Sequence, residues 1–232
     1  MSRTLAVIPA RAGSKRVPGK NTRIFAGKPL IQWTLEFACA YPGFDEVLIS
    51  TDCQEVARVA NACGKTLPWM RPSELATDEA GTVDVVLHAL LEYQARGQFF
   101  ERVAVLQPTT PFRRMSRWRE AQRLLDLGSP AVVGVSVAEQ HPYWTYWVDD
   151  SGAMQPCFPD KAKLRSQDLP AAATINGALY WIDVAVLREA RSFAPAGVHA
   201  VLFDDALESI DIDTEQDWMH AEQVLLGSGI FQ

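Results

Sequence analysis

The sequence predicts an α/β fold in which a mostly parallel sheet is flanked by helices. Short apolar segments alternate with amphipathic segments through the first 140 residues, a pattern typical of repeated β-α-β units. A basic loop with two glycines directly follows the first apolar segment, where such folds place a ligand. We expect residues 1–232 to form one domain, with a β-arm inserted at about 140–172.

The hydrophobic pattern places the elements in order along the chain. Before the arm, strands are expected at residues 5–8, 46–50, 103–106 and 131–137, and helices at 30–40, 54–62, 83–94 and 117–127. After the arm, strands are expected at 178–182 and 198–203, followed by a short extended segment at 209–213. A last helix is expected at 218–226, with Thr214 as its N-cap and Asp217 completing a variant of the capping box.

The pattern changes in the arm region. Aromatic residues and proline crowd together between His141 and Trp147, and Asp-Asp-Ser-Gly at 149–152 is typical of a hairpin turn. Exposed aromatic side chains on an extended excursion favour a subunit interface, so we expect the arm to form a homodimer. The alternative is a surface flap that covers the chain's own active site.

Composition excludes several classes of partner. Hydrophobic residues make up 48% of the chain and charged residues 22%, which is ordinary for a soluble globular protein. A net charge of −6 leaves no broad basic face, so we expect no nucleic-acid partner. No segment approaches the roughly 18 consecutive apolar residues of a membrane span, so no membrane partner is expected. The four cysteines show neither C-x-x-C pairs nor zinc-type spacing, which favours a reduced cytoplasmic location.

Positive charge is concentrated at the N-terminus of this acidic chain. The first 35 residues hold seven Lys or Arg and no Asp or Glu, whereas the rest hold 15 basic against 28 acidic side chains. Backbone amides and cations that converge in one loop suit a polyphosphate. We therefore expect Arg11, Lys15 and Lys20 to hold the phosphates of a nucleoside triphosphate. A solvated basic loop is the alternative.

The basic loop differs from a P-loop in two ways. Five residues separate Gly13 from Gly19, and Asn21 stands where a P-loop has the Ser or Thr that binds magnesium. Pro18 also lacks the amide hydrogen that a phosphate cradle uses. The pattern therefore argues against a P-loop kinase or ATPase.

Two late carboxylates, Asp211 and Asp213, are the metal candidates. Alternation through Ile-Asp-Ile-Asp at 210–213 puts both carboxylates on one face and both isoleucines in the core. Paired carboxylates suit Mg2+, which prefers oxygen ligands and keeps several waters. For Asp213, the alternative is a favourable charge at the N-terminus of the last helix.

Seven motifs occur in the order in which one known family carries them. They are I-P-A-R-x-G-S-K-R-x-P-G-K-N at 8–21, S-T-D at 50–52, R-P-S-E-L-A-T-D at 71–78, L-Q-P-T-T-P-F-R at 106–113, R-S-Q-D-L-P at 165–170, N-G-A-L-Y at 176–180 and S-I-D-I-D-T at 209–214. On these motifs the chain resembles the acylneuraminate cytidylyltransferases, or CMP-sialic acid synthetases, a family that includes legionaminic and pseudaminic acid cytidylyltransferases. The resemblance implies a Rossmann-like nucleotidyltransferase fold, a homodimer, and a requirement for CTP, an acidic sugar and Mg2+.

The resemblance also implies roles for particular residues. The nucleotide would be bound by Ala10, Arg11, Gly13, Ser14, Asn21, Arg71 and Thr82. The acidic sugar would be bound by Gln107, Arg165, Asn176 and Tyr180, and catalysis would use Arg11, Lys15, Lys20 and Asp211, with the metal on Asp211 and Asp213.

Each implied role has a physical basis. Arg71 and the Thr82 hydroxyl supply the donor and acceptor that cytosine needs. Gln107 ends a strand and so faces the ligand edge, and Arg165 is a natural bidentate partner for a carboxylate. The alternatives are a surface ion pair between Arg71 and Glu74, and a polar strand cap at Gln107.

The expected reaction is transfer of CMP from CTP to a 2-keto-3-deoxy nonulosonic acid, with release of pyrophosphate. The same chemistry on 3-deoxy-octulosonic acid, or a non-catalytic regulator that binds nucleotide, remains the alternative. One departure leaves the sugar open, because some members of the family have Lys where this chain has Trp144.

Overall fold

The computed structural model describes residues 2–227 and is built on one six-stranded sheet. Its strands are β1 (Thr4–Pro9), β4 (Glu46–Ser50), β5 (Arg102–Val105), β6 (Ala131–Val137), β9 (Ala173–Asp183) and β10 (His199–Leu202), in the spatial order β10-β6-β9-β5-β1-β4. The β1–β4, β1–β5 and β10–β6 pairs are parallel, and β9 runs antiparallel to both β5 and β6. The predicted mostly parallel sheet is confirmed.

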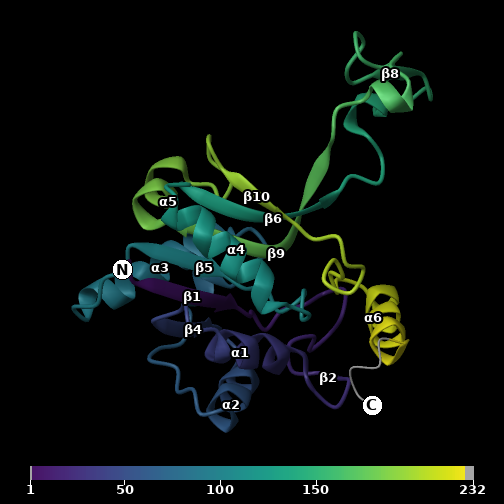
Figure 1. The fold of residues 1–232 in the computed structure, drawn as a ribbon. Coiled ribbons are helices and arrows are strands. Elements are labelled where there is room, and N and C mark those ends of the chain that lie inside the picture. The colour runs from purple at the N-terminus through teal and green to yellow at the C-terminus, as the bar shows by residue number, and fades with distance from the viewer. Residues whose placement is uncertain (1, 228–232) are drawn as a thin grey trace.

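Helices cover both faces of the sheet (Figure 1). They are α1 (Leu30–Ala40), α2 (Gln54–Ala62), α3 (Thr82–Ala95), α4 (Met115–Asp126), α5 (Val184–Ala190) and α6 (Glu215–Gly227), with 3₁₀ helices at Ser73–Leu75, Pro142–Trp144 and Ser166–Asp168. Alternate residues of β1 divide the core, since Ala6 and Ile8 pack toward α1, α2 and α4 whereas Leu5 and Val7 pack toward α3 and α5. A buried parallel strand between two helical layers explains why β1 reads as one continuous apolar run.

A third apolar cluster joins the two ends of the chain. Phe25, in the small hairpin of β2 (Ile24–Phe25) and β3 (Lys28–Pro29), packs edge-on against Trp218 of α6, with ring centroids 5.2 Å apart. Ile210 and Ile212 belong to the same cluster. This packing brings the segment before α6 beside the loop that follows β1.

The arm leaves the sheet between β6 and β9 and projects away from the body (Figure 1). Its tip is the hairpin of β7 (Tyr146–Val148) and β8 (Met154–Pro156), closed by the turn at 149–152 as predicted. At its root, the imidazole Nε2 of His141 lies 3.1 Å from the Pro170 carbonyl oxygen. Trp147, 72% exposed, and its neighbours leave an apolar surface on the hairpin open in the single chain.

Three features differ from the sequence-based expectations. β9 begins at Ala173 rather than near 178, because its ladder with β6 continues past a bulge to the arm. Residues 209–213 alternate in burial as expected but form no strand; the amide of Ile212 donates to the carbonyl of Thr109, in a loop rather than a strand. The short helix α5 and the β2–β3 hairpin were not predicted. None of the helices within residues 2–227 is long and apolar enough to cross a membrane.

Candidate active site

A cavity of about 560 Å3, here called the basic cavity, lies where β1 ends and the basic loop begins. The residues that line it include Arg11, Ser14, Lys15, Arg16, Lys20, Asn21, Arg71, Thr82, Gln107, Thr109 and Asp213. Segments from the N-terminal loop, from residues 71–85 and from the C-terminal region therefore share one cavity. Its position beyond the carboxyl end of β1 is where open α/β sheets bind ligands.

The backbone of the basic loop is held by the end of β4. The amide of Ala10 donates to the Ser50 carbonyl at 2.9 Å, and the amide of Ala12 donates to the Asp52 carboxylate at 2.9 Å. Asn21 closes the loop by donating from its side-chain amide to the Arg11 carbonyl at 3.1 Å. Asn21 thus orders the loop as well as lining the cavity. Ala10 and Gly13 belong to the same loop, but neither is among the described residues that line the cavity.

Two carboxylates neutralise the cations of the basic loop. Asp78 pairs with Arg11 at 2.6 Å and with Lys15. Asp213 pairs with Lys20 at 2.9 Å and with Arg16 at 2.6 Å. Hydrogen bonds from Lys15 and Arg11 lower the pKa of Asp78. A triphosphate entering the cavity would therefore exchange protein carboxylates for phosphate oxygens as partners of these cations.

Arg71 is buried at the back of the basic cavity and makes no ion pair with Glu74 among the residues described. Its Nε donates to the Ser50 hydroxyl at 3.0 Å and a terminal nitrogen donates to the Ser50 carbonyl. Burial lowers its pKa to about 10, so the guanidinium remains charged at neutral pH. Thr82, the first residue of α3, lines the same cavity.

A second cavity, of about 690 Å3, shares Gln107 with the basic cavity. Asn176, Tyr180 and Asp211 also line the second cavity. Gln107 therefore lies at the junction of two cavities, one lined by the predicted nucleotide-binding residues and the other by three predicted sugar-binding or catalytic residues.

The N-G pair in β9 shapes the second cavity. Gly177 has a φ of +77°, and a Cβ there would lie 3.2 Å from the Gln107 amide oxygen, so glycine suits this position on both counts. The Asn176 amide donates to the Ser136 hydroxyl at 3.0 Å and its oxygen accepts from the Ala178 amide at 3.0 Å. Asn176 is thereby fixed in one orientation at the cavity wall.

The two aspartates open onto different cavities. Ile210 and Ile212 are buried as predicted, whereas Asp211 lines the second cavity and Asp213 lines the basic cavity. Asp211 is partly open to solvent, yet the protein around its carboxyl group raises its pKa by desolvation, and the negative charge of Asp213 adds to the effect. Burial likewise raises the pKa of Tyr180, and Asp211 reinforces it.

The donor set at 211–213 fits a magnesium ion. Two carboxylates on neighbouring cavity walls are hard oxygen ligands, and Mg2+ commonly uses one or two of these together with substrate phosphates. Within residues 2–227 no group of three or more His, Cys, Asp or Glu side chains is arranged to hold a metal. A magnesium ion here would accordingly depend on phosphate oxygens for the rest of its ligands.

In the single chain, Arg165 is the predicted site residue that does not lie with the others. It precedes the 3₁₀ helix Ser166–Asp168 in the arm and is not among the described residues lining either cavity. The arm projects away from the body that contains both cavities (Figure 1).

Comparison with known proteins identifies the family. The family model described as Cytidylyltransferase matches residues 5–123. CMP-N,N'-diacetyllegionaminic acid synthase of Legionella pneumophila is 38% identical over 224 residues, covering 96% of each chain. Pseudaminic acid cytidylyltransferase of Campylobacter jejuni is 32% identical over 217 residues, covering 93% of each chain. The chain belongs to the cytidylyltransferase family. It is a nucleotidyltransferase enzyme, as predicted.

The fold agrees with that family. A solved structure of CMP:2-keto-3-deoxy-manno-octonic acid synthetase complexed with CTP superposes with a TM-score of 0.72 at 18% identity, covering 98% of this chain and 100% of that one. At this identity the likeness concerns the fold alone. The Rossmann-like nucleotidyltransferase fold expected for this cytidylyltransferase is confirmed.

Several residues that organise the site received no individual role from the sequence. Asp52 and Asp78 were quoted only as parts of motifs, although both hold the basic loop. Arg113 donates to the Gln107 carbonyl at 2.5 Å and to the Thr34 hydroxyl at 2.9 Å, and burial lowers its pKa. Their position inside the quoted motifs was the available signal, but no local pattern indicated their partners.

Proposed function

We propose that this cytidylyltransferase transfers CMP from CTP to a 2-keto-3-deoxy nonulosonic acid and releases pyrophosphate. The main support is the meeting of the basic loop and Asp213 at the basic cavity, where Lys20 and Asp213 pair at 2.9 Å, while Asp211 lines the second cavity that shares Gln107 with it. The named relatives that cover most of both chains act on legionaminic and pseudaminic acids, which are acids of this class.

In the proposed reaction, the anomeric hydroxyl oxygen of the sugar acid attacks the α-phosphorus of CTP. The new O–P bond forms as the anhydride bond to the β-phosphate breaks, pyrophosphate leaves in line, and the hydroxyl proton is released. Such a transfer depends mainly on positioning and on neutralising charge. Arg11, Lys15 and Lys20, which line the basic cavity, would neutralise the triphosphate and the departing pyrophosphate.

The base would lie deeper in the basic cavity. The Arg71 guanidinium is held in one plane by Ser50, so an oriented donor is available to the cytosine O2 without reorganisation. The Thr82 hydroxyl lies on the same wall. A pyrimidine amino group and carbonyl need such paired polar groups for selection.

The acceptor would occupy the second cavity, beside Gln107, Asn176 and Tyr180. Asp211 lines this cavity as well, so its carboxylate would lie beside the attacking hydroxyl. Bound at Asp211 and Asp213, Mg2+ would supply positive charge to phosphate oxygens and lower the pKa of the attacking hydroxyl.

The proposal also includes the oligomeric state and the cellular compartment. The exposed aromatic hairpin of the arm suits a homodimer, and Arg165 would then bind the sugar carboxylate of the partner subunit's site. The four cysteines are free, which suits a reducing cytoplasm.

A panel of four nucleotides against sialic, legionaminic, pseudaminic and 3-deoxy-octulosonic acids, read by pyrophosphate release, tests the proposal. We expect turnover with CTP and with at least one of the nine-carbon acids. A preference for the octulosonic acid would establish the eight-carbon alternative, and tight CTP binding without pyrophosphate release for any acid would establish a regulator. A preference for UTP or ATP would contradict the roles of Arg71 and Thr82.

A further inference from the structure

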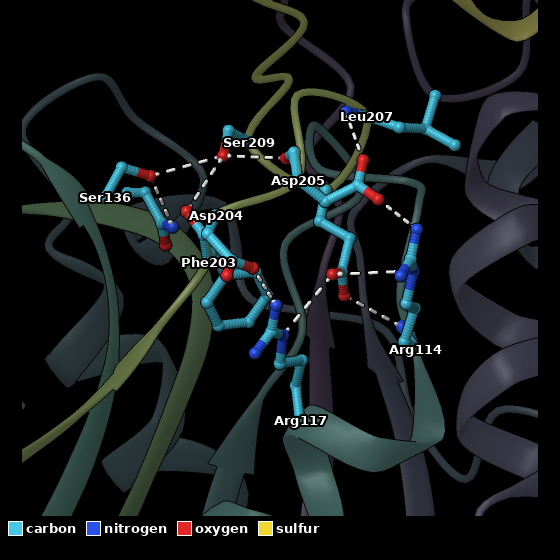
Figure 2. A network of polar contacts seen from close by, with 10 residues as sticks. Arg114, Arg117, Ser136, Phe203, Asp204, Asp205, Leu207 and Ser209 are labelled. Atoms are coloured by element: carbon cyan, nitrogen blue, oxygen red, sulfur yellow. Dashed lines mark hydrogen bonds and ion pairs between the residues drawn. The ribbon is translucent and has the colours of Figure 1, made fainter. Parts of the chain in front are cut away.

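The segment that leads to Asp211 is fastened to the first turn of α4 by a network of charges. Residues 203–209 connect β10 to the aspartate segment. Figure 2 shows Arg114, the N-cap residue of α4, and Arg117 of α4 reaching toward Asp205 and Asp204 in this segment. Arg117 pairs with Asp204, and Arg114 pairs with Asp205. These outer pairs are partly open to water, and surface ion pairs of this kind contribute little by themselves.

The centre of this network is Glu208, whose side chain is only 1% exposed. One carboxylate oxygen accepts the backbone amide of Arg114 at 3.2 Å, at the N-terminus of α4. The other lies 3.4 Å from Nε of Arg117 and 3.6 Å from Nε of Arg114. A buried carboxylate is tolerated only when such partners compensate its charge, so this geometry holds Glu208 in one place.

The residue after Glu208 connects the network to the second cavity. The Ser209 hydroxyl lies 3.1 Å from the Asp205 carbonyl oxygen and accepts from the Ser136 hydroxyl at 3.3 Å (Figure 2). Ser136 in turn accepts the Asn176 amide at 3.0 Å. A continuous hydrogen-bonded path therefore runs from the clamped segment to Asn176 on the cavity wall.

The clamped segment is also tied to the loop that carries Gln107. The amide of Ile212 donates to the Thr109 carbonyl at 2.8 Å, and Arg114 at the end of the same loop holds Glu208. Residues 208–212 are thus attached at both ends to residues 107–114. The spacing between Asp211 and Gln107 across the second cavity is set by these two attachments.

We propose that Glu208 is a positioning residue for acceptor binding, an inference that rests on the proposed acceptor role of the second cavity. Glu208 is absent from the described lining of both cavities, so it would contact neither a nucleotide nor an acceptor bound there. Its buried charge fixes the segment that presents Asp211 and, through Ser209 and Ser136, the orientation of Asn176. Weakening this clamp disturbs the acceptor side more than the nucleotide side, because Lys20 holds Ile212 and Asp213 independently of Glu208.

The test compares Glu208→Gln with wild type, using Asp204→Asn as the matched control. Asp204→Asn removes an exposed partner of Arg117, whereas Glu208→Gln removes the buried charge at nearly constant shape. For Glu208→Gln we expect the acceptor KM to rise about 10-fold, because small displacements at a reacting centre are costly. The Kd for CTP, measured by calorimetry without acceptor, should change less than about 2-fold, and Asp204→Asn should change neither value by more than about 2-fold.

A purely stabilising role for Glu208 predicts a different outcome. Glu208→Gln would then lower the Tm but leave both the acceptor KM and the CTP Kd unchanged well below that temperature, which would overturn the proposal. Equal losses in acceptor and CTP binding would overturn it as well. Hydrogen exchange gives a readout without turnover, and amides of 204–213 should exchange faster in Glu208→Gln while those of β1 and β5 do not.

Arg117→Gln provides a second approach if Glu208→Gln fails to fold. It removes one of the two guanidinium partners and leaves Arg114 to compensate the carboxylate, so the same selective rise in acceptor KM is expected, at about 3-fold. An Arg117→Gln enzyme with unchanged acceptor KM would contradict the proposal. If the wild-type enzyme turns over none of the sugar acids, the proposed function fails before any variant is compared.

Discussion

The Lys20 ammonium donates to the Asp213 carboxylate at 2.9 Å, although 193 positions separate the two residues. The same ammonium donates to the Ile212 carbonyl at 2.9 Å, and its side chain is only 11% exposed. The N-terminal cations and the C-terminal carboxylates therefore form one site whose parts hold each other. Lys20 has a structural task as well as a place at the triphosphate.

Lys20→Met is expected to lose both stability and activity, whereas Lys15→Met is expected to lose mainly activity. Removing Lys20 leaves the Ile212 carbonyl without its donor, which costs about 1–3 kcal/mol of unfolding free energy. Lys15 is 81% exposed, so its removal should change stability by less than about 0.5 kcal/mol. Both variants should lose about 10²-fold or more in kcat/KM for CTP, because a charge facing the phosphates is gone. Urea unfolding and pyrophosphate release measure the two effects, and an equally destabilised Lys15→Met would contradict this division.

Asp78→Asn is expected to strengthen the binding of bare polyphosphates. Asp78 competes with phosphate for Arg11 and Lys15, so its neutralisation should lower the Kd for tripolyphosphate by about 3-fold at low ionic strength. The gain should shrink as salt is added, because these groups are exposed. Calorimetry at two salt concentrations checks the prediction. Weaker tripolyphosphate binding in Asp78→Asn would instead mean that Asp78 mainly holds the loop open for the ligand.

Thr82→Ala is expected to reduce the preference for CTP over UTP, and Thr82→Ser to retain it. Both variants remove the methyl group of the side chain, but only Thr82→Ser keeps the hydroxyl on the cavity wall. Loss of one neutral hydrogen bond to the base corresponds to about 5-fold in the ratio of kcat/KM values. If the two variants discriminate equally well between CTP and UTP, the Thr82 hydroxyl does not contribute to recognition of the base.

Asp217→Asn is expected to destabilise the protein at neutral pH but not in acid. Burial tends to raise the pKa of Asp217, but hydrogen bonds from Thr214 and the Asp213 amide outweigh it and lower the pKa. A depressed pKa in the folded state stabilises the protein above the unfolded value of about 3.9, and this contribution is lost as pH falls through the folded pKa. Loss of a helix cap costs about 1 kcal/mol, which urea unfolding at pH 7 should detect.

The difference in unfolding free energy between Asp217→Asn and wild type should then become smaller as pH falls below about 4. Gln216→Ala, an exposed change in the same first turn of α6, serves as the control and should show no such pH dependence. A gap that stays constant with pH would show that the Asp217 charge does not support the cap.

The hydrophobic periodicity of the sequence predicted the helices and strands that have a clear apolar face or a buried apolar run. The bounds of α1, β4, α2 and β6 agree with the expected segments for this reason. The capping box at Thr214 and Asp217 was also predicted, and the two residues exchange hydrogen bonds as such a motif requires. The start of β9 was missed because residues 173–176, Ala-Thr-Ile-Asn, contain no continuous apolar run. They pair with β6 beyond the bulge in an exposed part of the sheet.

Sequence patterns could not predict which residues far apart in the chain contact one another. Glu208 looks like an ordinary surface acid until the fold buries it between Arg114 and Arg117, more than 90 positions away. Asp78 likewise meets Arg11 only because residues 71–82 and the basic loop both pack at the ends of β1 and β4. Alternation placed both isoleucines in the core, but it did not predict that Asp211 and Asp213 would line two different cavities.

Substitution of Arg165 tests most directly whether the arm contributes to a partner subunit's site. In the single chain Arg165 lines neither cavity among the residues described. A role in sugar binding therefore requires it either to act in a partner subunit's site or to approach its own site by movement of the arm. Arg165→Ala and Asp211→Asn should each lose most activity as homodimers. Co-expression with two affinity tags yields heterodimers in which one site carries both changes and the other carries neither. For action across the dimer, a random mixture should recover about a quarter of wild-type activity, because half of its dimers are mixed and each has one intact site. Heterodimers verified by light scattering that recover no activity would place Arg165 in its own chain's site. An Arg165→Ala homodimer with wild-type activity would place it outside catalysis, and a monomeric wild-type protein would rule out the dimer itself.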